Sequence, residues 1–480
     1  MNRNWLKALM GATALTAFAA APAMAQTEAA PEAPPTAEEA AAQAEFLSAQ
    51  IEAMQAQIEE LKKQVKTATP NWKGAPEFAG SDFKFKVRGR FMYDAAYVEN
   101  PNNLVASKEF GASTRVRRLR LGVEGGLPGG FAYKAEFDFA NAGVGYGDVT
   151  LAYKNPKSQF GVTIGNFESL NGFEQISSSR YISFIERAQF NEAFNNSRRL
   201  GVAVTYTSKD GQFKFDVGAF NDTINANTDN DDLILAGRAV YAPQAMGGQL
   251  HFGANFQHRK FQTNVLSNQY RARPFTQNAG FRFVDTGNVA ARGDDIYGLE
   301  FIGIFGSLHL SAEGQYTKVD AIRVPDVLPG RDATTGVRTN GDPSFFGFYA
   351  EAGYWLTGET RGYKNGTLDR TKVLNPFDKG GWGAFQINAR YDYLDLTDST
   401  GATLPTQVTA PNFVNGGTQT GYLASLIWQP IDYVRFTAQY TYGVVKGGPR
   451  AAAVVPVSTE SVVNRDYNFS AAMLRAAFDF

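Results

Sequence analysis

Apolar and charged residues alternate with a period of two from Phe83 onward, and this alternation limits the possible folds more than any other feature. The first segment interleaves two sets of residues, Phe83, Phe85, Val87, Phe91 and Tyr93 against Lys84, Lys86, Arg88, Arg90 and Asp94. Successive side chains of a β-strand point to opposite faces, so one face of this segment is aromatic and the other is charged. The pattern returns in about sixteen segments of roughly ten residues, which is typical of a transmembrane β-barrel.

A soluble β-sandwich alternates in the same way, and the aromatic residues distinguish the two folds. Membrane barrels carry aromatic girdles at their strand ends, and this chain has tyrosines there: Tyr93, Tyr206, Tyr241, Tyr393 and Tyr442. Connections alternate between short turns and long loops, except that 357–381 is too long for a turn on the short side. The sequence therefore predicts an all-β, antiparallel transmembrane barrel of about 16 strands over residues 80–480.

Composition excludes several other classes of protein. The 480 residues include no cysteine, which excludes disulfide scaffolds, thiol catalysis and Cys-based metal sites. A formal net charge of -1 argues against nucleic-acid binding, which needs a basic excess. The histidines His251, His258 and His309 lie far apart, and no nucleophile–base pair is evident from spacing. We therefore expect no enzymatic activity, no cofactor and no metal.

The N-terminal region predicts export and a helical stalk ahead of the barrel. Residues 1–25 join a basic start, an apolar stretch and Ala23-Met24-Ala25, the three features of a cleaved signal peptide. An Ala/Pro/Glu-rich linker follows over 26–45. Over 46–69, heptad spacing predicts a coiled-coil helix whose apolar seam is Leu47, Ile51, Met54, Ile58, Leu61 and Val65. An amphipathic helix packed on its own chain is the alternative.

Several segments resemble the phosphate-selective porin O and P family. Residues 114–125 (TRVRRLRLGVEG) are similar to its arginine-rich second strand, and 178–187 to its third loop. The segments 133–140, 356–361 and 380–395 also match in order. The resemblance implies a sixteen-stranded, trimeric channel in the outer membrane of a Gram-negative bacterium, with loop 168–198 folded into the pore and the coiled coil in the periplasm.

The last strand predicts how the chain is assembled. It alternates outward apolar residues that end at Phe480, which matches the signal read by the outer-membrane assembly machinery. The other expected partners are two further copies of the chain, small anions such as phosphate, outer-membrane lipid and lipopolysaccharide. We expect no nucleic-acid partner.

The charged strand faces predict which solutes pass. Rows of Arg and Lys inside a water-filled lumen favour anions, and Arg grips phosphate oxygens bidentately. The predicted pore-lining and anion-binding residues are Lys84, Lys86, Arg88, Arg90, Arg118, Arg120 and Lys134. A strict two-residue period places Arg117 on the opposite face of its strand, with Leu119 and Leu121.

The predicted constriction loop is less basic than this wall. Its candidate residues are Arg180, Glu186, Arg187 and Arg198, and the loop holds no lysine, unlike the phosphate-selective members of the family. Passive diffusion of small anions, including phosphate or polyphosphate, is the function that the sequence favours. A general porin on the same barrel and a barrel-anchored tether to the cell wall stay open as alternatives.

Deleting residues 26–70 tests the stalk. The stalk spans under three heptads, so contacts between barrels should carry most of the association. We expect both the full chain and the truncated chain to cross-link as homotrimers in the membrane fraction. A monomer after truncation would show that the stalk dominates assembly.

Overall fold

The computed structural model describes the following residues: 36–68, 70–72, 74–80, 83–101, 110–140, 143–224, 231–324, 326, 336–399, 413–454 and 459–480. The predicted signal peptide 1–25 and linker residues 26–35 lie outside the described residues. The chain divides into two compact units, Met1–Lys66 and Thr67–Phe480.

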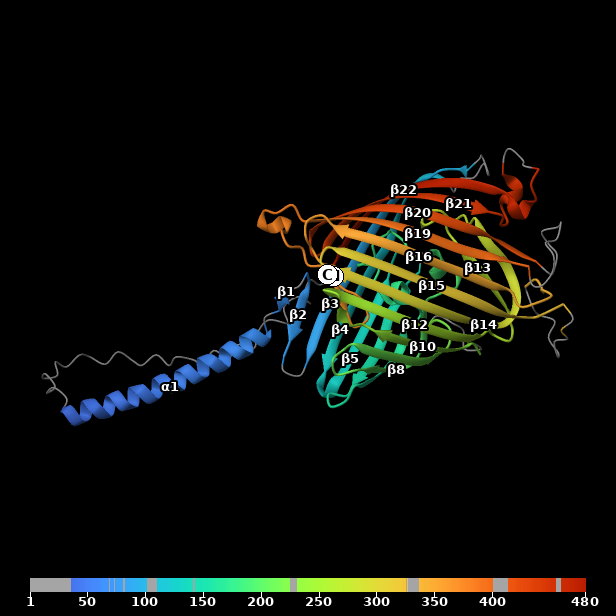
Figure 1. The fold of residues 1–480 in the computed structure, drawn as a ribbon. Helices are drawn as coiled ribbons and strands as arrows, with labels where there is room; N and C mark the ends of the chain where they lie inside the picture. Colours follow the sequence, from blue (N-terminus) through green and yellow to red (C-terminus); the bar gives the residue numbers. More distant parts are fainter. Residues whose placement is uncertain are drawn as a thin grey trace, which may run out of the picture. The chain divides into compact units, whose positions relative to one another are not determined.

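The described part of the N-terminal unit is one long helix, α1 (Ala37–Ala68) (Figure 1). It begins well before the predicted residue 46, because the Ala- and Glu-rich second half of the predicted linker consists of strong helix formers. The apolar side chains Leu47, Ile51, Met54 and Ile58 are exposed along this helix. Among the described helices, none is long and apolar enough to cross a membrane.

Within the described residues, sixteen antiparallel strands close into a barrel, which confirms the predicted fold (Figure 1). They are β3 (Lys84–Val98), β4 (Gly111–Leu127), β5 (Phe131–Asp138), β6 (Gly145–Lys154), β7 (Phe160–Glu168), β8 (Arg198–Thr207), β9 (Phe213–Phe220), β10 (Leu233–Tyr241), β12 (Gly248–Lys260), β14 (Val284–Phe305), β15 (Leu308–Ala321), β16 (Ser344–Trp355), β19 (Ala384–Asp398), β20 (Val414–Ile431), β21 (Val434–Lys446) and β22 (Asp466–Asp479). Each strand pairs with the next along the chain, and β22 pairs with β3 to close the barrel.

The remaining elements are short. The strands are β1 (Asn71–Trp72), β2 (Pro76–Ala79), β11 (Gln244–Ala245), β13 (Ser267–Ala272), β17 (Tyr363–Lys364) and β18 (Thr367–Leu368). The helices are α2 (Phe173–Ile176), α3 (Gln189–Ala193) and four 3₁₀ turns within the described residues, η2 (Pro128–Gly130), η3 (Phe377–Lys379), η4 (Ala451–Ala453) and η5 (Val462–Asn464).

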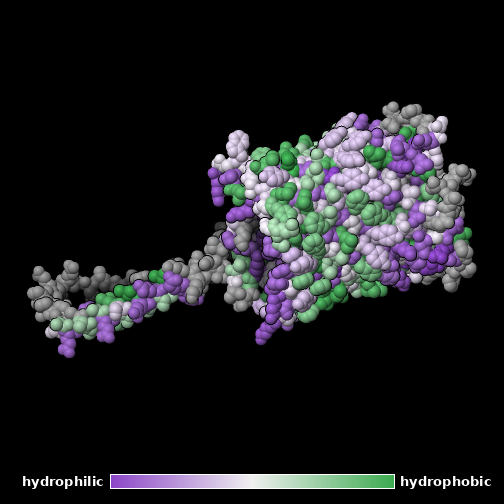
Figure 2. Space-filling model, viewed as in Figure 1, coloured by the Kyte–Doolittle hydropathy of each residue, from purple (hydrophilic) through white to green (hydrophobic). Residues whose placement is uncertain are grey.

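The two faces of the strands differ as the alternation predicts. On β3, Phe91, Tyr93 and Tyr97 are exposed, whereas Arg90 and Asp94 are buried on the inner face. Figure 2 shows apolar residues over the middle of the strands and hydrophilic residues towards the strand ends. Apolar side chains outside and charged side chains inside suit a barrel that is surrounded by lipid.

Two connections differ from the simple loops expected from the sequence. The connection 259–295 is largely extended, because β13 and the first part of β14 pair antiparallel within it. The turn between β16 and β19, residues 356–383, contains the hairpin β17–β18. Asn365 and Gly366, at φ of 52° and 80°, form its two-residue turn, an Asn-Gly pair that tolerates positive φ.

This long turn folds into the barrel, which explains the exceptional length of 357–381. Arg238 Nη2 on β10 donates to the Gly366 carbonyl at 3.1 Å, and the Leu368 amide donates to Ser177 Oγ at 3.1 Å. His251 Nδ1 on β12 lies 2.7 Å from the Tyr363 hydroxyl. The long turn (residues 356–383) therefore contacts both the barrel wall and the connection between β7 and β8.

The C-terminal residue completes the seam between the last and first barrel strands. The Phe480 amide donates to the Gly89 carbonyl at 3.0 Å, and the Gly89 amide donates to the Phe480 carbonyl at 3.2 Å. The Phe480 ring covers Gly89 so closely that a Cβ there would lie 2.1 Å from it. Phe480 therefore adds both hydrogen bonds and packing where the barrel closes.

Deleting Phe480 should lower the amount of barrel in the outer membrane at unchanged mRNA, because the closing seam and the terminal signal are both lost. Phe480→Tyr, which keeps the ring and both backbone hydrogen bonds, is the control and should assemble normally. Heat-modifiable barrel in the membrane fraction measures the outcome. Normal amounts of the deletion variant would contradict the prediction.

Candidate functional site

The connection between β7 and β8 crosses the inside of the barrel. The amide of Glu174 donates to Glu313 Oε2 on β15 at 3.0 Å, and the amide of Ile185 donates to Gln439 Oε1 on β21 at 2.7 Å. Arg475 Nη1 on β22 donates to the Ile185 carbonyl at 2.5 Å. We call residues 169–197 the constriction loop, because they reach from β7 and β8 to the wall opposite.

The constriction loop also faces the cations of β3 and β4. Arg90 Nη1 donates to Ser179 Oγ at 2.8 Å, and its Nη2 donates to Ser178 Oγ at 3.2 Å. The inward cations of β3, β4 and β5, named the basic wall below, are Lys86, Arg88, Arg90, Arg115, Arg117, Arg118, Arg120 and Lys134.

A β-bulge turns Arg117 inward, so its predicted position on the outer face is wrong. The β3–β4 register shifts by one residue, since Met92 pairs with Arg118 whereas Tyr93 pairs with Val116. Arg117 is the extra residue, and its Nε donates to Glu186 Oε1 of the constriction loop at 2.7 Å. Strict alternation cannot anticipate a bulge. The spacing of the arginines was the one sign of the bulge in the sequence. Arg115 and Arg117 occupy odd positions, whereas Arg118 and Arg120 occupy even positions, so the two-residue period changes between 117 and 118.

Carboxylates hold many of the predicted site residues in place. The pairs are Lys84 with Glu77 (3.1 Å), Arg88 with Glu124, Arg120 with Glu136 (2.5 Å) and Asp138 (2.8 Å), Lys134 with Asp148, Arg180 with Asp479 (3.1 Å), and Arg198 with Asp148 and Glu168 (2.7 Å each). Arg198, at the start of β8, thus clamps both ends of the constriction loop to β6. These pairs fix positions but leave little net charge for a solute.

Some cations of the basic wall and of the constriction loop form no ion pair with a carboxylate among the described residues. They include four predicted site residues: Lys86, Arg90, Arg118 and Arg187. Arg187 donates instead to the carbonyls of Glu174 and Ser177, at 2.8 Å each. Arg90 is occupied by the two serine hydroxyls. These four side chains carry the local excess of positive charge.

Arg118 is the least satisfied of the four. No hydrogen bond joins its guanidinium to any residue in the described part of the chain, and its Nε is buried. The strongest charge effects on it come from four other arginines: Arg120, Arg117, Arg90 and Arg187. A guanidinium with free donors among like charges is suited to bind an anion, above all an oxyanion that accepts two parallel hydrogen bonds.

The acidic residue of the constriction loop does not cancel this charge. Burial alone would raise the pKa of Glu186, but Arg117 beside it lowers that pKa to about 2. Glu186 is therefore ionised at neutral pH and is neutralised by Arg117 and by Arg475 Nη2, which lies 3.2 Å from Oε1. The predicted constriction residue Glu186 thus acts as a clamp between loop and wall.

Metal binding has no comparable basis. Across the described ranges, no group of three or more His, Asp or Glu residues could hold a metal ion. The inward histidines pair with carboxylates instead: His251 Nε2 lies 3.0 Å from Glu300 Oε2, and His309 Nε2 lies 2.9 Å from Glu351 Oε1.

Known proteins are similar in sequence to this chain over most of its length. The family model for phosphate-selective porin O and P matches residues 85–466. An uncharacterized protein of Caulobacter vibrioides is 34% identical over 420 residues, which cover 85% of this chain and 76% of that one. Porin O of Pseudomonas aeruginosa is 26% identical over 68% of this chain and 76% of its own.

The chain is also similar to solved barrel structures. The outer membrane channel DcaP of Acinetobacter baumannii aligns with a TM-score of 0.48 and 14% identity, over 84% of this chain and 99% of that one. The family match and the two sequence relatives each cover more than two thirds of this chain or of the relative. The chain therefore belongs to the phosphate-selective porin O and P family and forms a channel in the outer membrane.

Proposed function

We propose that this channel conducts small anions by passive diffusion and that phosphate is among its preferred solutes. The observation that carries the proposal is Arg118, a half-buried arginine with a buried Nε and no hydrogen-bond partner among the described residues. Lys86, Arg90 and Arg187 add positive charge, and no carboxylate in the described ranges forms an ion pair with them. The description of the family as phosphate-selective supports phosphate as the solute to test first.

The local charge decides selectivity, although the whole chain is close to neutral. At about 0.1 M salt, charges beyond a Debye length of about 10 Å are largely screened, so distant acidic loops have little effect on a solute in the constriction. An anion beside Arg118 interacts with the nearby cations through a medium that water screens only in part. The lumen therefore favours anions over cations of the same size.

Arginine takes the place of the lysines that the constriction loop lacks. Arg90 positions the hydroxyls of Ser178 and Ser179. Guanidinium forks and hydroxyl groups both donate hydrogen bonds to phosphate oxygens. A general porin on this barrel is the second candidate, because the many paired cations leave only a few free to select a solute.

We also propose that residues 1–25 are removed on export and that α1 lies in the periplasm. An even number of strands brings both ends of the barrel to the same side of the membrane. A stalk on that side with an exposed heptad seam is suited to self-association.

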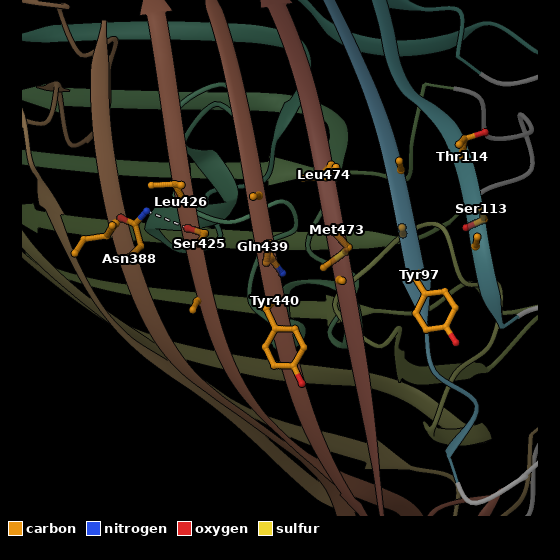
Figure 3. A pocket seen from close by; sticks show the side chains of 17 residues that line it. Tyr97, Ser113, Thr114, Asn388, Ser425, Leu426, Gln439, Tyr440, Met473 and Leu474 are labelled. Carbon is orange, nitrogen blue, oxygen red and sulfur yellow. Dashed lines mark hydrogen bonds between the residues drawn. The ribbon is translucent and has the colours of Figure 1, made fainter. Parts of the chain in front are cut away.

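A homotrimer is the assembly that we propose for the barrel. The outer wall of β19–β22, β3 and β4 is hollowed by about 970 Å³, since many of its residues are small: Ala95, Ala112, Ala424, Ala438 and Ala472. Figure 3 shows Tyr97 on β3 and Tyr440 on β21, on either side of β22 within this hollow. Small residues let two protein surfaces approach closely in a membrane.

Ala438→Trp should reduce the cross-linked trimer, because an indole fills the hollow where a neighbouring copy is expected. Ala254→Trp, at an exposed position on β12, is the matched control and should leave the trimer intact. Equal trimer yields from both variants, measured by cross-linking in the membrane fraction, would show that this wall is not the interface.

Replacing Arg118 tests the conduction path. In a salt gradient across a planar bilayer, the wild-type reversal potential should indicate anion preference, and phosphate should block chloride current. Arg118→Gln, alone and with Lys86→Gln, should shift the reversal potential towards cations. Because a charge-assisted hydrogen bond contributes about 1.5–3 kcal/mol, the phosphate block should weaken by roughly tenfold or more.

The control removes one charge of each sign. Arg88→Gln with Glu124→Gln deletes an ion pair of the same wall and should keep the reversal potential close to that of the wild type. Unchanged selectivity and block in Arg118→Gln would show that Arg118 does not line the path. A barrel that conducts no current at all would favour the tether instead.

A further inference from the structure

A second group of arginines surrounds a small pocket between the constriction loop, the long turn and the barrel wall. The pocket has a volume of about 20 Å³. Its charged lining residues are Arg180 of the loop, Arg361 and Arg370 of the long turn, Asp432 and Arg435 of β21 and its preceding turn, and Asp479 of β22. Four cations thus face two carboxylates.

Both carboxylates are already engaged. Asp479 is shared by two arginines, since Arg180 Nη1 lies 3.1 Å from its Oδ2 and Arg370 Nη2 also contacts that oxygen. The Asp432 carboxylate accepts the amide of Val373 at 2.9 Å. Neither carboxylate forms an ion pair with Arg361 or Arg435 in the described part of the chain.

The terminal nitrogens of Arg361 and Arg435 are engaged by the constriction loop and the barrel wall. Arg361 Nη1 lies 2.7 Å from Ser183 Oγ and 2.9 Å from His309 Nε2. Arg435 donates to the carbonyls of Arg180 and Ile182, at 2.8 and 2.6 Å. Arg361 Nη2 donates to the carbonyl between them, that of Tyr181, at 2.8 Å. The nearest carboxylate oxygen to Arg361 that counts as an ion pair, Glu351 Oε1, is 4.0 Å away and already pairs with His309.

The Nε atoms of the same two side chains donate no hydrogen bond to any described residue. Arg361 Nε and Arg435 Nε are both buried and have no acceptor among the described residues. Arg361 as a whole is 8% exposed, and burial lowers the pKa of its guanidinium. Arginine nevertheless keeps its charge in proteins, so a buried guanidinium without a counter-charge is destabilising. Arg361 has only the distant Glu351 as a counter-charge, and Arg435 has none among the described residues. An anion in the pocket supplies an acceptor to both Nε–H groups and a counter-charge to Arg435.

We propose that this pocket binds a single monatomic anion, chloride under ordinary salt conditions, beside Arg361 and Arg435. The volume open to a water-sized particle is only about 20 Å³, which favours a monatomic anion over a larger polyatomic one. The bound halide lies between the two arginines that donate to three successive carbonyls of the constriction loop. It thereby holds together the long turn, β21 and the loop. This site is separate from Arg118, and its occupant stabilises the constriction.

Bromide locates the site directly. Crystals of the full chain grown in bromide should give an anomalous difference peak in the pocket, and the peak should be absent from Arg361→Gln/Arg435→Gln. Arg118→Gln is the matched control and should keep the peak, which separates this site from the proposed conduction path. An empty wild-type pocket, or a peak that persists in the double variant, overturns the proposal.

A solution measurement covers the case in which the double variant does not fold. The wild-type barrel should unfold at a higher temperature in sodium chloride or bromide than in sodium gluconate at equal ionic strength, followed by heat-modifiability in detergent. Arg435→Lys, which keeps the charge but removes the Nε–H, should lose most of this halide-dependent difference. A wild-type barrel whose unfolding temperature is the same in all three salts overturns the proposal.

Discussion

Backbone hydrogen bonding in lipid is the constraint on which the rest of this structure depends. No water in the hydrocarbon layer can satisfy a free amide or carbonyl, so the strands must pair with one another all the way round. Closure through β22 and β3 gives every barrel strand two neighbours and two faces of opposite character. The apolar face meets lipid, and charged residues along the middle of the strands, such as Arg90, Asp94 and Arg120, lie on the inner face.

Charges gathered in one lumen must be arranged so that they do not repel one another. Most of the cations do this by pairing: Arg120 and Lys134 lie against carboxylates of the same wall, and Arg198 ties β8 to β6. The pairs make a rigid frame with little net charge. In our proposal, selectivity comes from the few cations without ion pairs in the described part of the chain, above all Arg118.

Local alternation made the barrel, its strand count and the inward positions of Arg88, Arg90, Arg118 and Arg120 predictable. Features that depend on contacts distant in sequence were not predictable. The contacts of Arg361 and Arg435 with the loop carbonyls require the folded loop. The ion pairs of Arg88 and Arg120 require the exact register of neighbouring strands. The unusual length of 357–381 was visible, but length alone does not show that a turn folds inward.

The bulge at Arg117 changes how densely charge is packed along the channel. A regular strand rises about 3.3 Å per residue and turns every second side chain inward, so residues 115–120 would present three side chains to the lumen. With one residue inserted, β4 presents Arg115, Arg117, Arg118 and Arg120 over the same stretch. Loss of that single residue would restore perfect alternation and leave a smoother, more weakly charged pore. The irregular strand therefore gives a higher linear charge density than any regular strand of this length.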